Sequence, residues 1–183
     1  MVKEEKRTRR GIVVKEVEKV QWIQANHSGH WTHFHDAFDH AKKLLEEWMV
    51  QHHDKDCYPP TIIHVTDGEY NGATRETVQQ KANELKSMFT NDGNVIMFNI
   101  HISADKDSPV TFPRSKEELG EDKYAINLFE LSSLLPLRYN EEICKMKETD
   151  SSQRHSAMAV NADMATLIKL MDIGTPTNIS ASK

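Results

Sequence analysis

Residues 58–68, YPPTIIHVTDG, constrain the fold more than any other stretch of the chain. Pro59 and Pro60 end whatever precedes them, because proline lacks the backbone N–H that helices and sheet ladders need. Residues 61–65 are a short apolar and largely β-branched run, which is typical of a buried central strand of a parallel sheet. Open α/β sheets bind ligands just beyond such strand ends. Asp67 is therefore the first site candidate, and an ordinary Asp-Gly turn is the alternative.

A helix and a second apolar run follow this strand. Thr74 starts the helix, residues 91–94 (NDGN) end it, and one helical face carries Val78, Ala82, Leu85 and Met88. Residues 95–102, VIMFNIHI, are again strand-like. Strand, helix and strand in this order predict a right-handed βαβ unit. We therefore expect the strands at 61–66 and 95–102 to be adjacent and parallel.

Other periodic segments predict three more helices. Residues 34–49 carry apolar side chains three and four apart, and Thr32 can cap that helix. A helix over 122–135 stops at Pro136, and a final helix begins at Asn161 and ends at Gly174. The expected remainder is strands at 12–14, 17–23 and 157–160, a long loop at 105–121, and a polar segment at 145–155.

The composition of the chain argues against some classes of protein. It has 183 residues, a net charge of −5 and a pI near 6.1, which argues against a general nucleic-acid-binding surface. No stretch has the length of a membrane span, and the first ten residues, MVKEEKRTRR, are mostly charged. The two cysteines, Cys57 and Cys144, predict reduced thiols in a cytoplasmic protein. We expect a charged tail over 1–11, one domain over 12–174 and a flexible tail over 175–183.

Five segments in order resemble a bacterial von Willebrand factor type A (VWA) domain, namely GHWTHFHDAF, PPTIIHVTDGE, NVIMFNIHIS, LFELSSLLP and AVNADMATLIKLMDIGT. The resemblance implies a Rossmann-like α/β fold, with a mostly parallel sheet flanked by helices. It also implies a non-enzymatic protein-interaction module with a metal-ion-dependent adhesion site for Mg²⁺. Thr32 matches the family's metal-binding threonine and Asp67 its aspartate. A partner's acidic side chain would complete the metal shell.

The chain departs from the VWA pattern at its start. The family's Asp-x-Ser-x-Ser is absent, so the resemblance implies a domain truncated at the N-terminus. A truncated gene product, a misplaced start and half of a split protein are all open readings. The family strands that would flank residues 61–65 are absent, and a bare apolar edge favours pairing with a complementing chain or a second copy. Two protein oxygens leave four Mg²⁺ positions to water or a partner, so we expect weak or absent Mg²⁺ binding.

Two alternatives come from other functional classes. A metal-free, degenerate VWA fragment would have a purely structural role. A histidine-rich metallohydrolase would use His30, His33 and His35 as ligands. Against the hydrolase, histidines two apart on a helix do not share a face, and no HExxH is present. His64 and His101 fall inside predicted strands, where hydrogen-bonded core roles are expected.

Overall fold

The computed structural model describes residues 2–8, 11–17, 33–52, 56–67, 70–102, 108–147 and 153–174. The chain divides into two compact units, Met1–His30 and Trp31–Lys183.

The first unit contains an antiparallel hairpin. β1 (Val2–Thr8) pairs with β2 (Gly11–Val17) over its whole length. The strand predicted at 12–14 lies within β2, and most of the one predicted at 17–23 lies outside the described residues. No strand was predicted at 2–8, and the backbone register there runs from Val2 opposite Val17 to Thr8 opposite Gly11.

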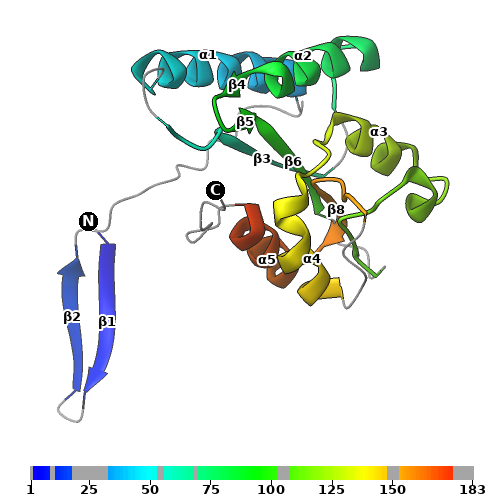
Figure 1. Ribbon diagram of the computed structural model, residues 1–183. Helices are drawn as coiled ribbons and strands as arrows, with labels where there is room; N and C mark the ends of the chain where they lie inside the picture. The colour runs from blue at the N-terminus through cyan, green and yellow to red at the C-terminus, as the bar shows by residue number, and fades with distance from the viewer. Residues whose placement is uncertain are drawn as a thin grey trace. The chain divides into compact units, whose positions relative to one another are not determined.

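The second unit is built on a mixed, mostly parallel four-stranded sheet (Figure 1). Its order is β3 (Thr61–Thr66), β6 (Ile96–Ile102), β8 (Met158–Ala162) and β7 (Val110–Thr111). β3 and β6 are parallel neighbours, which confirms the predicted pair, and β8 continues the parallel set. The prediction that residues 61–65 form a buried central strand is wrong, because β3 lies at the edge of the described sheet and β6 is the more buried strand. The short β7 is antiparallel to β8 and lies within the segment expected to be a long loop.

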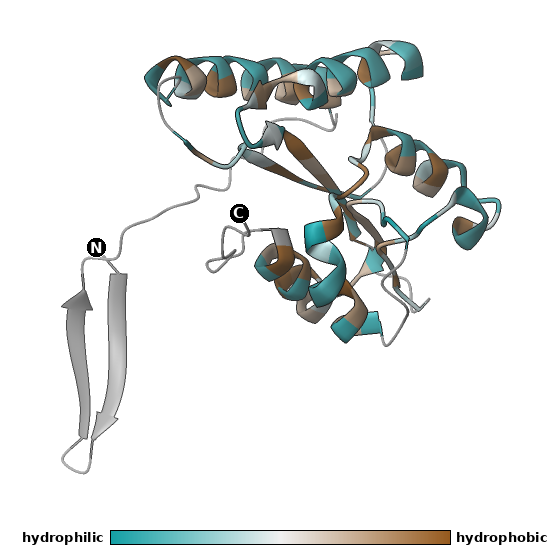
Figure 2. Cartoon of the chain, viewed as in Figure 1, coloured by the Kyte–Doolittle hydropathy of each residue, from teal (hydrophilic) through white to brown (hydrophobic). Residues whose placement is uncertain are grey.

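Five α-helices of the described residues cover the two faces of this sheet (Figure 1). α1 (Phe34–His52), α2 (Arg75–Ser87) and α3 (Lys123–Leu131) enclose one core with Met97 and Met158. α4 (Asn140–Lys147) and α5 (Met164–Gly174) enclose the other with Phe98 and Ile100. Alternate residues of β6 point to opposite faces, so both cores draw on this one buried strand. Figure 2 shows its hydrophobic character between the more polar helices.

The starts of α2 and α3 follow the prediction. Thr74 Oγ1 accepts a hydrogen bond from the backbone N–H of Thr77 and caps α2. Asp122 caps α3 in the same way. The prediction that Asn161 starts the last helix is wrong, because Asn161 belongs to β8. Asp163 accepts from the Thr166 N–H at 2.7 Å instead, one residue before α5.

Other boundaries depend on contacts far along the chain. α3 ends at Leu131, short of the predicted 135, because Ser133 donates to the Met97 carbonyl and Leu135 to that of His155. α2 ends at Ser87, and the residues before β6 form a small hairpin of β4 (Phe89–Thr90) and β5 (Gly93–Asn94). Two short 3₁₀ helices, η1 (Lys116–Leu119) and η2 (Leu137–Tyr139), and the whole of α4 were not predicted.

The described helices include none with both the length and the apolar character that a membrane crossing requires.

Candidate functional site at the carboxyl edge of the sheet

Asp67 lies directly after β3 and is exposed, as the sequence predicts for a residue at a strand end. Its backbone carbonyl accepts a hydrogen bond from His101 Nε2 at 3.0 Å. The Nδ1 atom of His101 lies 3.4 Å from the backbone N of Asn161, which donates to it. His101 therefore carries its proton on Nε2 and connects the carboxyl ends of β3, β6 and β8. Its expected hydrogen bonding is present, although its side chain is half-buried rather than in the core.

Of the two predicted magnesium ligands, Asp67 alone lies within the described residues. Thr32 lies outside them, so its role as a metal ligand and as the cap of α1 stays a prediction. The Asp67 carboxylate joins no group of three or more His, Cys, Asp or Glu ligands within the described ranges. One carboxylate does not make a site for Mg²⁺, which prefers several oxygen ligands. The described part of the chain therefore does not by itself fit the magnesium site that the resemblance implies.

A different group of side chains does converge, at the start of α1. His33 Nδ1 lies 3.0 Å from one Asp36 carboxylate oxygen, and His35 Nε2 lies 3.4 Å from the other. The sequence argument that His33 and His35 cannot face the same way is wrong, because α1 begins only at Phe34. His33 precedes the helix, so helical phase does not fix its direction. The two ring centroids are 5.4 Å apart.

Buried aromatic residues fix the backbone beneath this group. Phe34, between the two histidines, is 1% exposed. Its ring lies 4.9 Å from that of Tyr70 and 4.4 Å from that of His64. Tyr70 belongs to the segment that leads from β3 to α2, and its hydroxyl accepts a hydrogen bond from Asn127 of α3 at 3.0 Å. The first turn of α1 is therefore anchored to the core, whereas His33 and Asp36 beside it remain exposed.

His64 makes a side-chain hydrogen bond, as predicted, and is half-buried rather than fully in the core. Its Nδ1 lies 2.8 Å from Asn99 Oδ1, and Asn99 in turn donates to Ser132 Oγ at 3.0 Å. Burial lowers the pKa of His64 below its ordinary value, although the bond to Asn99 partly opposes this. Asn99 and Ser132 are themselves buried. A substrate could not reach these side chains, so the chain of polar groups stabilises the fold and is not a nucleophile–base pair.

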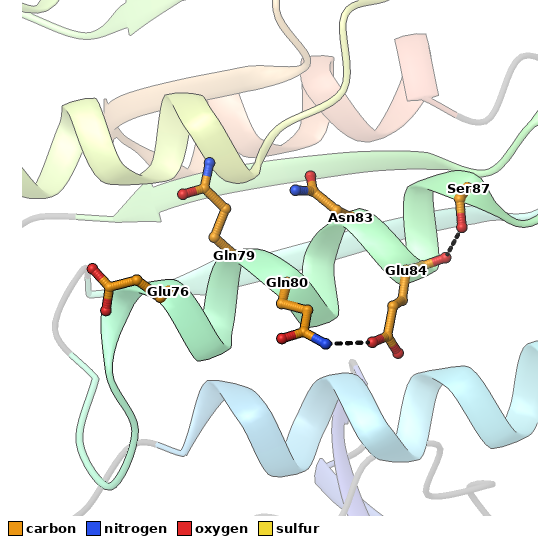
Figure 3. A pocket seen from close by; sticks show the side chains of 6 residues that line it. All are labelled: Glu76, Gln79, Gln80, Asn83, Glu84 and Ser87. Carbon is orange, nitrogen blue, oxygen red and sulfur yellow. Dashed lines mark hydrogen bonds between the residues drawn. The ribbon is translucent and has the colours of Figure 1, made fainter.

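Two hollows on the surface offer no arrangement typical of catalysis. The one in Figure 3 is lined entirely by α2, through Glu76, Gln79, Gln80, Asn83, Glu84 and Ser87. These polar side chains project from one helix, and Gln80 and Ser87 both bond to Glu84. The other is lined by Asp56, Cys57, Tyr58, Asn91 and Asp92. The Arg138 guanidinium pairs with Asp92 there at 3.0 Å.

Comparison of the chain with protein-family models, with curated proteins and with solved structures finds no match.

Proposed function

We propose that this chain is a cytoplasmic, non-enzymatic protein-interaction module of VWA-like type, which binds a partner polypeptide along the outer edge of β3. The observation that carries the proposal is the position of β3 in the sheet. Among the described residues, β3 pairs with β6 on one side and has no strand on the other. Its outer backbone groups are the template that an added strand uses.

The composition of β3 also supports this proposal. Edge strands that avoid association use lysine, proline, a bulge or a charged inward residue. Thr61–Thr66, TIIHVT, contains no lysine, proline or carboxylate, and its register with β6 is continuous. The strand itself therefore carries none of these four protections against pairing.

The side chains of β3 extend an apolar surface toward that edge. Ile62 packs against the core beneath α1 and α2, and Ile63 packs against the core beneath α4 and α5. Val65 has the same orientation as Ile63 but is 42% exposed. On α5, which contacts β3, Met164 and Ile168 are also exposed. An extended apolar segment of a partner would cover Val65 while its backbone pairs with β3.

Magnesium has a secondary place in this proposal. Asp67 follows the proposed binding strand directly, so a cation held by Asp67 and Thr32 would lie at one end of the added strand. An acidic side chain of the partner could then complete the metal shell. The metal-free structural role remains the alternative, since Asp67 is the one predicted ligand that the described residues contain.

An edge-blocking substitution tests the interaction. Val65→Lys places a charge on the exposed edge, and we expect it to abolish capture of the partner from a cell extract. Leu44→Lys is the matched control, because Leu44 is an apolar residue of α1 that is 54% exposed and does not belong to β3. Thermal unfolding should show that both variants are folded.

Hydrogen exchange then locates the contact in the reconstituted pair. Those backbone amides of β3 that face away from β6 should become protected when the captured partner is added. Equal capture by Val65→Lys, or protection confined to other elements, would overturn the proposal. Turnover of a generic ester or phosphoester that Asp67→Ala abolishes would favour an enzyme instead.

A further inference from the structure

We infer that His33, His35 and Asp36 form a binding site for a divalent transition metal, with Zn²⁺ the ion that fits best. The site is separate from the proposed partner-binding edge and uses neither Thr32 nor Asp67. Among the described residues, these three form a group of potential metal ligands. One ligand atom from each side chain lies within 4.8 Å of the other two.

The distances between ligand atoms are close to those of a zinc site. Two ligands at ordinary Zn–N or Zn–O distances in a tetrahedral shell lie about 3.3 Å apart. His33 Nδ1 lies 3.0 Å from Asp36 Oδ2 and His35 Nε2 lies 3.4 Å from Asp36 Oδ1. One ligand atom from each of the three residues lies within 4.8 Å of the other two. Small rotations of the exposed His33 and Asp36 side chains would bring all three atoms around one ion.

The surrounding structure orients both imidazole rings. Gly72 lies in the connection from β3 to α2, and its φ of +81° is a conformation that favours glycine. A Cβ added there would lie 3.2 Å from His35 Cε1 and 3.4 Å from His33 Nε2. The bare backbone at Gly72 therefore packs against both rings, while the buried Phe34 fixes the chain between them. This arrangement limits the positions that the rings can adopt.

The ligand types select the class of metal. Two imidazoles and one carboxylate suit Zn²⁺ and its first-row neighbours, whereas Mg²⁺ prefers oxygen ligands. Three protein ligands leave the fourth tetrahedral position to water or to a group from another molecule. The Asp36 charge offsets the positive end of α1, which would otherwise repel a cation.

One feature limits the affinity of this site. A metal on His35 Nε2 places the ring proton on Nδ1, which is buried and has no hydrogen-bond partner within the described residues. Histidine ligands usually donate that proton to a carboxylate or carbonyl, and loss of this bond costs 10- to 100-fold in metal affinity. We therefore expect a dissociation constant in the micromolar range, weaker than that of a structural zinc site.

Calorimetric titration of the full 183-residue chain, prepared without a polyhistidine tag, tests the inference with Zn²⁺ as the probe. We expect one equivalent to bind, and His33→Gln or His35→Gln to weaken binding at least tenfold. His40→Gln should leave it unchanged, since His40 is exposed on α1 outside the group. Absence of saturable binding, or equal binding by the His33→Gln/His35→Gln double variant, would overturn the inference.

Two further measurements separate a metal site from a simple hydrogen-bonded group. Co²⁺ should give the absorption of a tetrahedral site with nitrogen ligands, and the double variant should lose it while its thermal unfolding remains cooperative. Gly72→Ala should weaken Zn²⁺ binding by crowding both rings. Unchanged Co²⁺ absorption in the double variant would contradict the assignment. Partner capture in the presence of a chelator is independent of this result, so the two proposals can fail separately.

Discussion

The Nδ1 atom of His64 lies 2.8 Å from the Oδ1 atom of Asn99, and this bond joins the neighbouring strands β3 and β6 through their side chains. Asn99 also donates to Ser132 Oγ, which in turn donates to the Leu128 carbonyl at 2.6 Å. The buried polar groups therefore connect the sheet edge to the end of α3. Satisfied networks of this kind specify one packing arrangement, because leaving any member unpaired is costly.

Asn99→Ala should lower the free energy of unfolding by about 2–4 kcal/mol, because the substitution leaves both His64 and Ser132 without their partner in the core. Asn83→Ala on the exposed face of α2 is the control and should change stability by less than about 0.5 kcal/mol. Urea unfolding of both variants measures the difference. Equal stability of the two variants would show that the buried chain contributes little.

Stability should fall as the pH falls below about 6.5, the ordinary pKa of histidine. Burial lowers the pKa of both His64 and His155 in the folded protein. Below the ordinary value, the unfolded chain binds protons that these folded side chains do not, so protonation favours unfolding. The loss continues until the pH reaches the lowered pKa values. Urea midpoints across this range measure the effect.

The same titration has an internal control. His64→Gln should flatten the pH dependence between neutral pH and the region where carboxyl groups titrate, even though the variant is less stable overall. A slope that is unchanged in His64→Gln would assign the pH dependence to other groups.

Asp122→Ala should cost about 1 kcal/mol by removing the cap of α3. The Asp122 carboxylate accepts hydrogen bonds from the backbone N–H groups of Tyr124 at 2.9 Å and Ala125 at 3.1 Å. Asp122→Asn keeps an oxygen acceptor at this position and should retain most of the stability. Thermal unfolding of the two variants checks this, and equal losses would assign the effect to charge rather than to capping.

Calorimetry with Mg²⁺ should detect no micromolar binding by the full chain, because Asp67 supplies one carboxylate and the cation holds its water strongly. Asp67→Ala should therefore leave the titration unchanged. Micromolar affinity that disappears in Asp67→Ala would contradict this expectation. It would indicate that Thr32 and other oxygens complete the site.

Local patterns in the sequence were sufficient for the central part of the fold. The apolar runs at 61–66 and 95–102, with an amphipathic helix between them, predicted two parallel neighbouring strands. Thr74 and Asp122 marked helix starts correctly, because a capping side chain bonds to the backbone within three residues. The exposed position of Asp67 followed from its place beyond a strand end. Each of these features depends on residues close together in the chain.

Tertiary structure decided what local patterns could not. Asn161 has the side chain of a cap, but pairing with the sheet keeps it in β8, and α3 stops early because its following residues bond to β6 and His155. α4 depends on burial of Ile143 against distant segments. His33 and His35 converge because the buried Phe34 and the backbone of Gly72 position them. Such contacts join residues far apart in sequence, so no local periodicity could reveal them.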